Sequence, residues 1–254
     1  MNLKGGTAKT VTAINLAAIL AEDYAQHVLL VDADSQANLT EFVSRAPADR
    51  MNVGGLADLL RGCSETALLP TKIEKVTILP GDETLMALDV TAASKGKADP
   101  MALRDWLEAI GKTRSPRISR CVIDCPPAFS AAAAAALIAA DEVVIPVKLD
   151  AFGVRGLANL IEQITNMKRL NADLAIAGVL PTMFYPSEQQ KAAEQKLRDA
   201  LEPAGIRVFP HITRSPKVDE MTFAQKPIIW TSPRSKAARD YRRFVSQLTE
   251  GGER

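Results

Sequence analysis

The chain has 254 residues, of which 47% are apolar, and its formal net charge is +1. A chain of this length and composition can bury one large core, as a globular protein does. Its three scattered cysteines exclude a disulfide framework and fit a reducing cytoplasm. The longest apolar run, Ala131 to Ala140, is too short to span a bilayer, and no signal peptide is visible.

The first feature along the chain is a glycine-rich loop that leads into a helical pattern. The pattern runs from Val11 to Ala21, and the loop before it is Lys4-Gly5-Gly6-Thr7-Ala8-Lys9-Thr10. Glycines let backbone N–H groups wrap a phosphate, and the positive end of the helix points at the same anion. The order is typical of a phosphate-binding loop, in which Lys9 reaches the β- and γ-phosphates and Thr10 holds Mg²⁺.

Three positions set this loop apart from the common pattern. Lys9 already contacts the phosphates of the bound nucleotide. The second lysine, Lys4, therefore suggests two nucleotide sites that face each other across a dimer. Ala8 stands where glycine usually precedes the lysine, and Val11 stands where a second threonine is common. We expect the methyl group of Ala8 to hinder the loop's approach to phosphate. The alternative is a Gly-Gly turn before a helix that binds no ligand.

Two predicted strands after the loop end in aspartates. The apolar run from His27 to Val31 predicts a buried strand, and Asp32 and Asp34 follow it. A second strand, 120–123, ends at Asp124, the position of a carboxylate that holds Mg²⁺, usually through water. Taken singly, Asp32 could cap a turn or helix, and Asp124 could be a plain strand-end residue. The order of loop and carboxylates favours the functional interpretation.

The other predicted elements alternate between strand and helix. In chain order they are a helix at 56–60, a strand at 76–79, a connection at 91–100, helices at 101–110 and 131–140, a strand at 143–147, a helix at 157–170, a strand at 174–180, a helix at 189–201, an edge strand at 207–210 and a helix at 235–248. This alternation predicts an α/β fold, with a mostly parallel central sheet and helices on both faces. We expect a single domain over residues 1–254.

The N-terminus departs from this plan. A phosphate loop normally follows a strand, but only Met1-Asn2-Leu3 precede Lys4. We therefore expect the first, central strand to be truncated and the natural chain to begin a few residues upstream. If Met1 is the true start, we expect low stability and weak nucleotide binding, because the neighbouring strands lose their pairing.

Basic residues concentrate near the C-terminus. Between Arg207 and Arg243 there are nine Lys or Arg and three Asp or Glu, a local charge of +6. The rest of the chain has 22 basic and 27 acidic residues, a charge of −5. This separation is expected of a domain with one polyanion-binding face, although a charge cluster alone is more often a solvated helix.

Together these motifs resemble the ParA/MinD family of P-loop ATPases, and within it the ParA-type partitioning ATPases. The loop has the family form KGGxxKT, and VDADSQANLT resembles the second family motif. The segment from IDCPPAFS to GLANLI resembles the Mg²⁺-site strand and the elements after it. ITRSPKVDEMTFAQKPII and SPRSKAARDYRRF resemble the C-terminal DNA-binding region. The resemblance covers nearly the whole chain and implies a P-loop NTPase fold.

The resemblance also implies roles for the loop and the carboxylates. Lys4 would reach the partner's ATP, Lys9 would bind phosphate and Asp34 would orient the attacking water, which makes these three the candidate catalytic residues. Thr10 and Asp124 would hold Mg²⁺. The cofactor-binding set is the whole loop, Lys4, Gly5, Gly6, Thr7, Ala8, Lys9, Thr10 and Val11, with Gly5 at the dimer contact.

For partners, the resemblance implies ATP with Mg²⁺, an ATP-dependent homodimer and non-specific double-stranded DNA. A ParB-like centromere-binding protein would stimulate a slow ATPase, and the protein would be cytoplasmic and associated with the nucleoid. The residues expected on the DNA-binding face are Lys217, Arg234, Lys236 and Arg239.

Two other functions are open to the sequence. A MinD-like ATPase would bind membranes through an amphipathic final helix, and Tyr241, Phe244, Val245 and Leu248 fall on one face of that helix. A docked core helix shows the same pattern, so we favour DNA over the membrane. The other possibility is an ATP-binding switch with impaired hydrolysis, which the departures at Ala8 and Val11 support.

Overall fold

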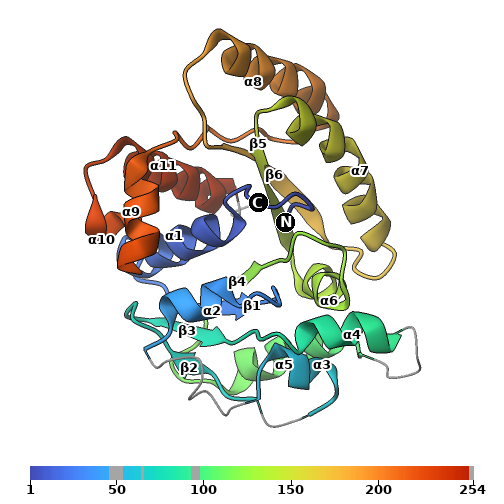
Figure 1. Cartoon of the computed structure of the whole chain (residues 1–254). Helices are drawn as coiled ribbons and strands as arrows, with labels where there is room; N and C mark the ends of the chain where they lie inside the picture. Colours follow the sequence, from blue (N-terminus) through green and yellow to red (C-terminus); the bar gives the residue numbers. More distant parts are fainter. Residues whose placement is uncertain (46–53, 64–65, 93–97, 252–254) are drawn as a thin grey trace. The chain divides into compact units, whose positions relative to one another are not determined.

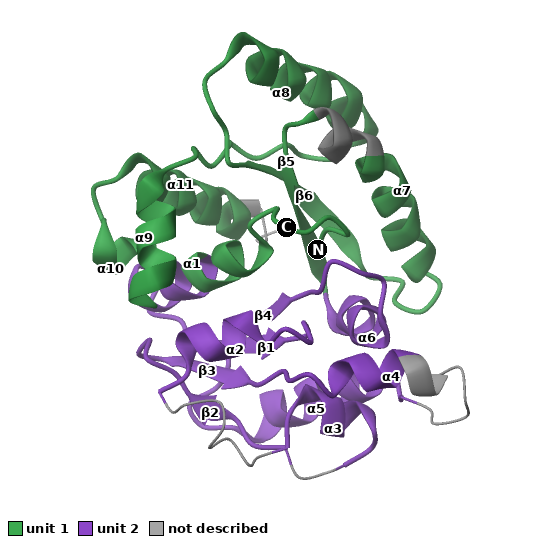
Figure 2. Ribbon diagram, viewed as in Figure 1, with its two compact units in different colours: residues 1–15, 141–254 green, residues 16–140 purple. Residues whose placement is uncertain are grey.

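The structure is a computed structural model that describes residues 1–45, 54–63, 66–92 and 98–251 (Figure 1). Two compact units make up the chain: residues 1–15 with 141–254, and residues 16–140 (Figure 2). The division falls inside the first helix, α1 (Lys9–Glu22). We refer to them as the loop unit and the carboxylate unit, because they hold the glycine-rich loop and the predicted aspartates.

The carboxylate unit is built on a four-stranded sheet in the order β2-β3-β1-β4. Its parallel strands are β1 (Val28–Asp32), β3 (Val76–Leu79) and β4 (Arg120–Asp124), and the short β2 (Leu69–Pro70) is antiparallel to β3. Every residue of β1 is buried, as its continuous apolar run predicts. The register sets Asp32 beside Asp124, so both carboxylates leave the sheet at the same edge.

Helices of the same unit supply its core. They are α2 (Asn38–Val43), α3 (Leu56–Leu60), α4 (Leu85–Ala92), α5 (Ala102–Thr113) and α6 (Ala131–Ala139). Leu29 and Val31 point to one face of the sheet, where they join buried side chains of α3, α5 and α6. The alanines of α6 are small, which lets that helix lie close to its neighbours.

The loop unit contains a two-stranded parallel sheet, β5 (Glu142–Lys148) and β6 (Ala175–Thr182). Its helices are α7 (Ala151–Met167), α8 (Glu188–Leu201), the 3₁₀ turn η2 (Glu202–Ala204), α9 (Pro216–Ala224), α10 (Ile228–Thr231) and α11 (Lys236–Gly251). The N-terminal residues lie beside β5, because the Met1 amine donates to the Val144 carbonyl at 2.7 Å and Asn2 Nδ2 to the Pro146 carbonyl at 2.6 Å.

The segment 207–213 runs beside β6, where an edge strand was predicted at 207–210. It forms isolated bridges, Val179 with Val208 and Phe184 with Thr213, rather than a regular strand. The segment approaches β6 closely at Gly178, which lies at a register shift of β6 and has φ +152°. A Cβ atom there would lie 2.6 Å from the Arg207 carbonyl oxygen, so the glycine is what admits the segment.

The predicted α/β class and its mostly parallel pairing are confirmed, and the pairing is distributed over one sheet in each unit. The single domain stays a prediction. Helices α2, α4, α9 and α10 were not predicted, and part of the predicted connection, 93–97, lies outside the described residues. No helix within the described ranges is both long and apolar enough to cross a membrane.

Candidate nucleotide-binding site

The glycine-rich loop of the loop unit leads directly into α1. Helix α1 begins at Lys9, and the Thr12 amide donates to the Ala8 carbonyl at 2.9 Å. Gly5 and Gly6 are exposed, and a Cβ atom built on either would meet nothing within 4 Å. The loop backbone and the positive end of the helix therefore face open space, which fits a phosphate group.

The two lysines of the loop lie close together. Lys9 Nζ donates to the Lys4 carbonyl at 3.2 Å, which folds the Lys9 side chain back across the loop. Lys4 Nζ contacts both carboxylate oxygens of Asp150 at 2.9 Å, and Lys148 Nζ lies 3.5 Å from the same carboxylate. The Lys4 side chain is 38% exposed. Its cation is therefore neutralised within its own chain and can still be reached from solvent.

Two residues that the sequence patterns did not single out hold the loop in place. Asp150 follows β5, and Thr182 is the last residue of β6. Thr182 Oγ1 lies 3.2 Å from the Thr7 carbonyl and 3.3 Å from the Val147 carbonyl, so one buried hydroxyl bridges the loop and β5. Both residues lie at the C-terminal ends of predicted strands, the rule that selected Asp34 and Asp124.

Ala8 adopts a backbone conformation that favours glycine. Its φ is +62°, close to the +67° of Gly6. An L-residue in this left-handed region costs roughly 1–2 kcal/mol, because its Cβ approaches the following carbonyl. The expectation that an alanine is unfavourable at this position therefore has a local physical basis in the loop backbone itself.

The carboxylates of the second unit differ sharply in their surroundings. Asp32 is fully buried and accepts from the Thr40 amide and hydroxyl, both at 2.8 Å, and from the Asp34 amide at 3.2 Å. Thr40 lies in the first turn of α2. Asp32 therefore fixes the turn after β1 and the start of α2, which is the capping alternative raised from the sequence.

Burial also changes the acidity of Asp32. Removal of its carboxyl group from water raises its pKa to about 6, and the hydrogen bonds from Thr40 oppose that shift. Gly81 packs against the same residues: its amide donates to Thr40 Oγ1 at 3.1 Å. A Cβ atom added at Gly81 would lie 2.4 Å from the Asp32 carbonyl oxygen. Ionised Asp32 therefore lowers the stability of the fold.

Asp34 and Asp124 complete this edge of the sheet. Asp34 is half-buried, and its Oδ1 accepts from the Gln36 amide at 3.1 Å. Asp124 is 3% exposed, and its carbonyl accepts from the Ala33 amide at 2.9 Å. The structure thus brings Asp32, Asp34 and Asp124 together at the carboxyl ends of β1 and β4. Thr10 belongs to the other unit, and its pairing with Asp124 at one Mg²⁺ stays a prediction.

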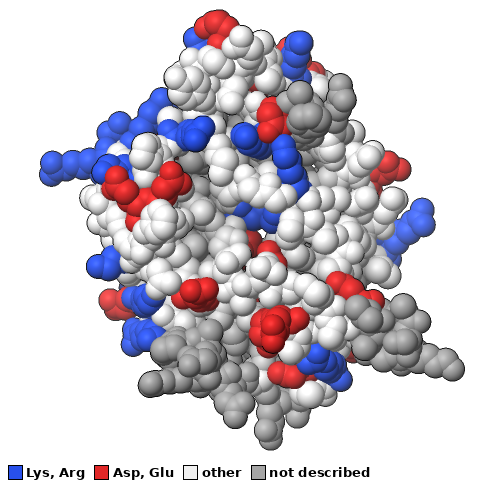
Figure 3. Space-filling model, viewed as in Figure 1, with Lys and Arg blue, Asp and Glu red and all other residues white. Residues whose placement is uncertain are grey.

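The basic residues expected to bind DNA lie on α9 and around the start of α11. Arg234, Lys236 and Arg239 are exposed, and Arg239 Nη1 donates to the Arg234 carbonyl at 3.1 Å. No acidic residue occupies the first turn of α11. Lys217, on α9, pairs with Glu220 at 2.7 Å. Basic side chains gather at the upper left of Figure 3, with acidic ones beside them.

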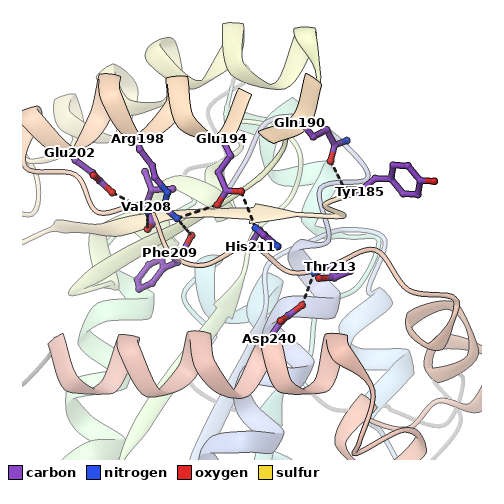
Figure 4. Close-up of polar contacts among 10 residues, drawn as sticks. All are labelled: Tyr185, Gln190, Glu194, Arg198, Glu202, Val208, Phe209, His211, Thr213 and Asp240. Atoms are coloured by element: carbon purple, nitrogen blue, oxygen red, sulfur yellow. Dashed lines mark hydrogen bonds and ion pairs between the residues drawn. The ribbon is translucent and has the colours of Figure 1, made fainter. Parts of the chain in front are cut away.

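The segment before this basic region is tied to helices on both sides (Figure 4). Arg198 of α8 donates to the carbonyls of Val208 at 2.8 Å and Phe209 at 3.3 Å, and it pairs with Glu194 at 3.2 Å. Glu194 also contacts His211 Nδ1 at 2.9 Å. On the α11 side, the Thr213 amide donates to Asp240 at 3.0 Å. These contacts fix the path by which the chain enters α9.

The apolar face of α11 is part of the core. Tyr241, Phe244 and Val245 are at most 1% exposed, and Phe244 meets Phe209 edge to face at 5.0 Å. These are the side chains that a membrane-binding final helix would need to present to lipid. The pattern that suggested membrane binding is therefore that of a docked helix.

Comparison with known proteins agrees with this arrangement. The model of an AAA domain family matches residues 1–176, more than half of the chain. The chain is 30% identical to the chromosome partitioning protein ParA of Caulobacter vibrioides, over 97% of this chain and 91% of that protein. The chain belongs to the ParA/MinD family of P-loop ATPases. The resemblance found from the sequence is thereby confirmed.

Two further proteins are similar to this chain. It is 32% identical to the chromosome-partitioning ATPase Soj of Thermus thermophilus, over 97% of this chain and 92% of that protein. Its structure matches cobyrinic acid a,c-diamide synthase from Mycobacterium smegmatis, solved with bound ADP and magnesium, with a TM-score of 0.77. That match has 26% identity and covers 98% of this chain and 92% of the other.

Replacement of Ala8 by glycine should stabilise this ATPase. Ala8→Gly removes the left-handed strain, and we expect the free energy of unfolding in urea to rise by about 1 kcal/mol. Ala192→Gly, at an exposed position inside α8, is the matched control and should lose about 1 kcal/mol. If both substitutions destabilise the protein equally, Ala8 is not strained.

The raised pKa of Asp32 predicts a pH-dependent stability. From about pH 4 to about pH 6 the folded protein holds a proton on Asp32 that the unfolded chain has released, so stability falls as pH rises. Relative to Asp32→Asn, the wild type should lose up to about 3 kcal/mol across this window, since one pKa unit corresponds to 1.36 kcal/mol. Urea unfolding from pH 4 to 7.5 measures this difference.

The control is Asp105→Asn, which replaces an exposed carboxyl group of α5 in the same unit. Its stability should follow the wild type at every pH. A constant difference between wild type and Asp32→Asn over the whole range would contradict the assignment of a buried, proton-binding carboxyl group.

Proposed function

We propose that this chain is a DNA-partitioning ATPase, which binds ATP and Mg²⁺ at the glycine-rich loop, dimerises and binds double-stranded DNA without sequence preference. The observation that carries the proposal is the presence of two lysines, Lys4 and Lys9, in one loop. Lys9 Nζ lies 3.2 Å from the Lys4 carbonyl oxygen. One lysine suffices for the phosphates of the chain's own nucleotide. The second is explained by a nucleotide bound to another copy.

The loop fits ATP with Mg²⁺. Its glycines are open, α1 directs its positive end toward the same space, and the similar cobyrinic acid a,c-diamide synthase, with 26% identity, was solved with ADP and magnesium. Lys9 would contact the phosphates, and Thr10 and Asp124 would hold the metal ion, with Asp124 acting through water. The ion would neutralise charge on the phosphates, while the residues of the loop orient them.

Lys4 would act on the ATP of the partner subunit. Its ammonium group has only to exchange one anion, the Asp150 carboxylate, for another, a phosphate of the facing nucleotide. Asp150 is 28% exposed, so the ion pair is partly screened by water and its loss costs little. Asp150 would keep Lys4 extended toward the mouth of the loop until the two subunits meet.

DNA would bind the face that α9 and α11 form. Lys236 and Arg239 lie in the first turn of α11, where the helix end is already positive and no acidic residue compensates. An external polyanion would neutralise both side-chain charges and the positive end of the helix. The net charge of +6 between residues 207 and 243 supports the same conclusion.

Hydrolysis would be slow in the isolated protein and would separate the dimer from DNA. Asp34 is half-buried at the carboxyl end of β1, where it would orient water for attack on the terminal phosphate. A ParB-like partner would stimulate the reaction, as the resemblance to ParA-type partitioning ATPases implies. Each cycle of ATP binding and hydrolysis would then load and release DNA.

Removal of Lys4 should separate ATP binding from dimerisation. Lys4→Ala keeps Lys9, so binding of a fluorescent ATP analogue should change by less than about threefold, while self-association with a slowly hydrolysed analogue should be abolished. Sedimentation velocity measures the association state. Lys148→Ala removes the other lysine beside Asp150 and should dimerise normally. A Lys4→Ala protein that still dimerises with the analogue would contradict the role in trans.

Removal of Lys217 should weaken DNA binding and its dependence on salt. Fluorescence anisotropy with a random duplex, with ATP against ADP over a salt series, tests the proposed function as a whole. A plot of log K against log salt has a negative slope. For Lys217→Ala, the magnitude of this slope should decrease by about one for each DNA phosphate that the lysine neutralises in the wild type. Binding of equal strength with ATP and ADP, or none from the folded wild type, would overturn the proposed function.

The matched control is Lys191→Ala. Lys191 pairs with Glu188 on α8 at 2.8 Å, as Lys217 pairs with Glu220 on α9 at 2.7 Å, and both pairs are exposed and three residues apart. The two substitutions remove the same charge and the same kind of surface pair. An equal decrease of DNA affinity in both variants would mean that net charge, rather than the face of α9 and α11, binds DNA.

A further inference from the structure

Asn15 connects the helix after the loop to two helices of the C-terminal region. It lies in the second turn of α1 with a fully buried side chain. Its Nδ2 donates to the Val11 carbonyl at 2.8 Å and to Met221 Sδ of α9 at 3.4 Å. Its Oδ1 accepts from the Ile228 amide at 2.9 Å. One amide group therefore contacts α1, α9 and α10.

The bond to Ile228 meets a specific need of α10. Ile228 is the first residue of that helix, and the preceding residue, Pro227, contributes no side-chain hydrogen bond to the helix start. Backbone N–H groups in a first turn have no partner inside the helix, and Ile228 is fully buried. Asn15 supplies the missing acceptor from another element of the same unit.

A second contact joins α1 to α11. Thr12 Oγ1 lies 3.4 Å from the Tyr241 hydroxyl, and both residues are buried. Burial raises the pKa of Tyr241 to about 12, so its phenol stays protonated at neutral pH. Thr12 is also the residue whose amide bonds to Ala8 of the loop. The first two turns of α1 therefore contact α9, α10 and α11.

Local preference does not explain an asparagine at position 15. Asparagine is a weak helix former, and an amide buried in a helix is unfavourable unless its polar atoms are bonded. A leucine, which has the same number and branching of side-chain heavy atoms, would suit the apolar surroundings and the helix equally well. The hydrogen bonds to Val11 and Ile228 are what the amide adds.

We propose that Asn15, together with Thr12, is a positioning residue that couples the nucleotide loop to the basic helices. The proposal rests on the proposed function. A phosphate that moves the first turn of α1 also moves Val11 and Asn15. Helix α10 must follow, because otherwise the buried Ile228 amide loses its acceptor. The basic side chains on α9 and α11 then change position with the nucleotide.

Coupling of this kind is reciprocal. If ATP strengthens DNA binding by a given factor, DNA must strengthen ATP binding by the same factor. A residue that carries the coupling alters both factors together and leaves each ligand's separate affinity nearly unchanged. This behaviour distinguishes a positioning residue from one that merely contributes to folding.

The test compares wild type with Asn15→Leu, which keeps the number and branching of the side-chain heavy atoms and removes the hydrogen bonds. We expect the ratio of DNA affinities with an ATP analogue and with ADP to fall by about tenfold or more, within the range typical of coupled sites. Affinity for the analogue without DNA should stay within about threefold, because Lys9 and the glycines are intact. An unchanged DNA ratio in a folded Asn15→Leu protein would overturn the proposal.

A second variant and a matched control keep the test decisive. If Asn15→Leu does not fold, Thr12→Val removes the other contact and should lower the same ratio. Thr165→Val is the control, since the Thr165 hydroxyl bonds to the Ile161 carbonyl of its own helix, α7, at 2.7 Å. It should leave the ratio at the wild-type value. Equal ratios in Thr12→Val and Thr165→Val would count against the coupling.

Hydrogen exchange separates failure of this proposal from failure of the proposed function. Binding of the ATP analogue without DNA should change amide exchange of the peptide spanning 226–231 in the wild type but not in Asn15→Leu. If the wild type does not bind DNA but shows this change, the proposed function fails and the coupling stands. If amide exchange of this peptide in the wild type does not change when the nucleotide analogue binds, the coupling fails, whether or not the protein binds DNA.

Discussion

The start of α1 is the constraint on which the functional arrangement of the loop unit depends. A helix presents N–H donors and a positive end at its first turn, and both are satisfied best by an anion. For that end to face open space, the loop before it must turn sharply, which requires positive φ at Gly6 and Ala8. The turn holds its place because the Thr182 hydroxyl is shared between the Thr7 carbonyl and β5.

The carboxylate unit shows how burial divides tasks among similar residues. Asp32 and Asp34 are two positions apart, yet Asp32 is buried and its Oδ2 accepts from both the Thr40 amide and the Thr40 hydroxyl. Asp34 lies in the turn that Asp32 holds and keeps part of its surface in solvent. The buried carboxylate therefore fixes the backbone, which leaves the half-buried one able to meet a ligand.

The sequence predicted the secondary-structure elements better than it predicted the contacts between distant residues. The strand at 28–31 and the loop at 4–10 are visible because apolar runs and glycine spacing are local signals. The partners of Lys4 and Thr7 were not found, because Asp150 and Thr182 lie more than 140 residues away along the chain. The edge strand at 207–210 was predicted from its apolar residues, but the segment pairs with β6 only through isolated bridges at Val179 and Phe184. The membrane alternative was equally local: the spacing of Tyr241 and Phe244 cannot tell lipid from a protein core.

Several features of the two units are locally unfavourable. Ala8 occupies a left-handed conformation, Asp32 is an acid without water, and Lys236 and Arg239 lie at the positive end of α11. The first two features each cost on the order of 1 kcal/mol or more, and a cation at the positive end of a helix costs about 0.3–1 kcal/mol, noticeable fractions of the roughly 5–15 kcal/mol by which proteins are stable. Packing elsewhere, as in the fully buried β1, must offset these costs. A sequence selected for stability alone would place an acidic residue at the start of α11, so the basic residues there are best explained by a polyanion that relieves the same local cost.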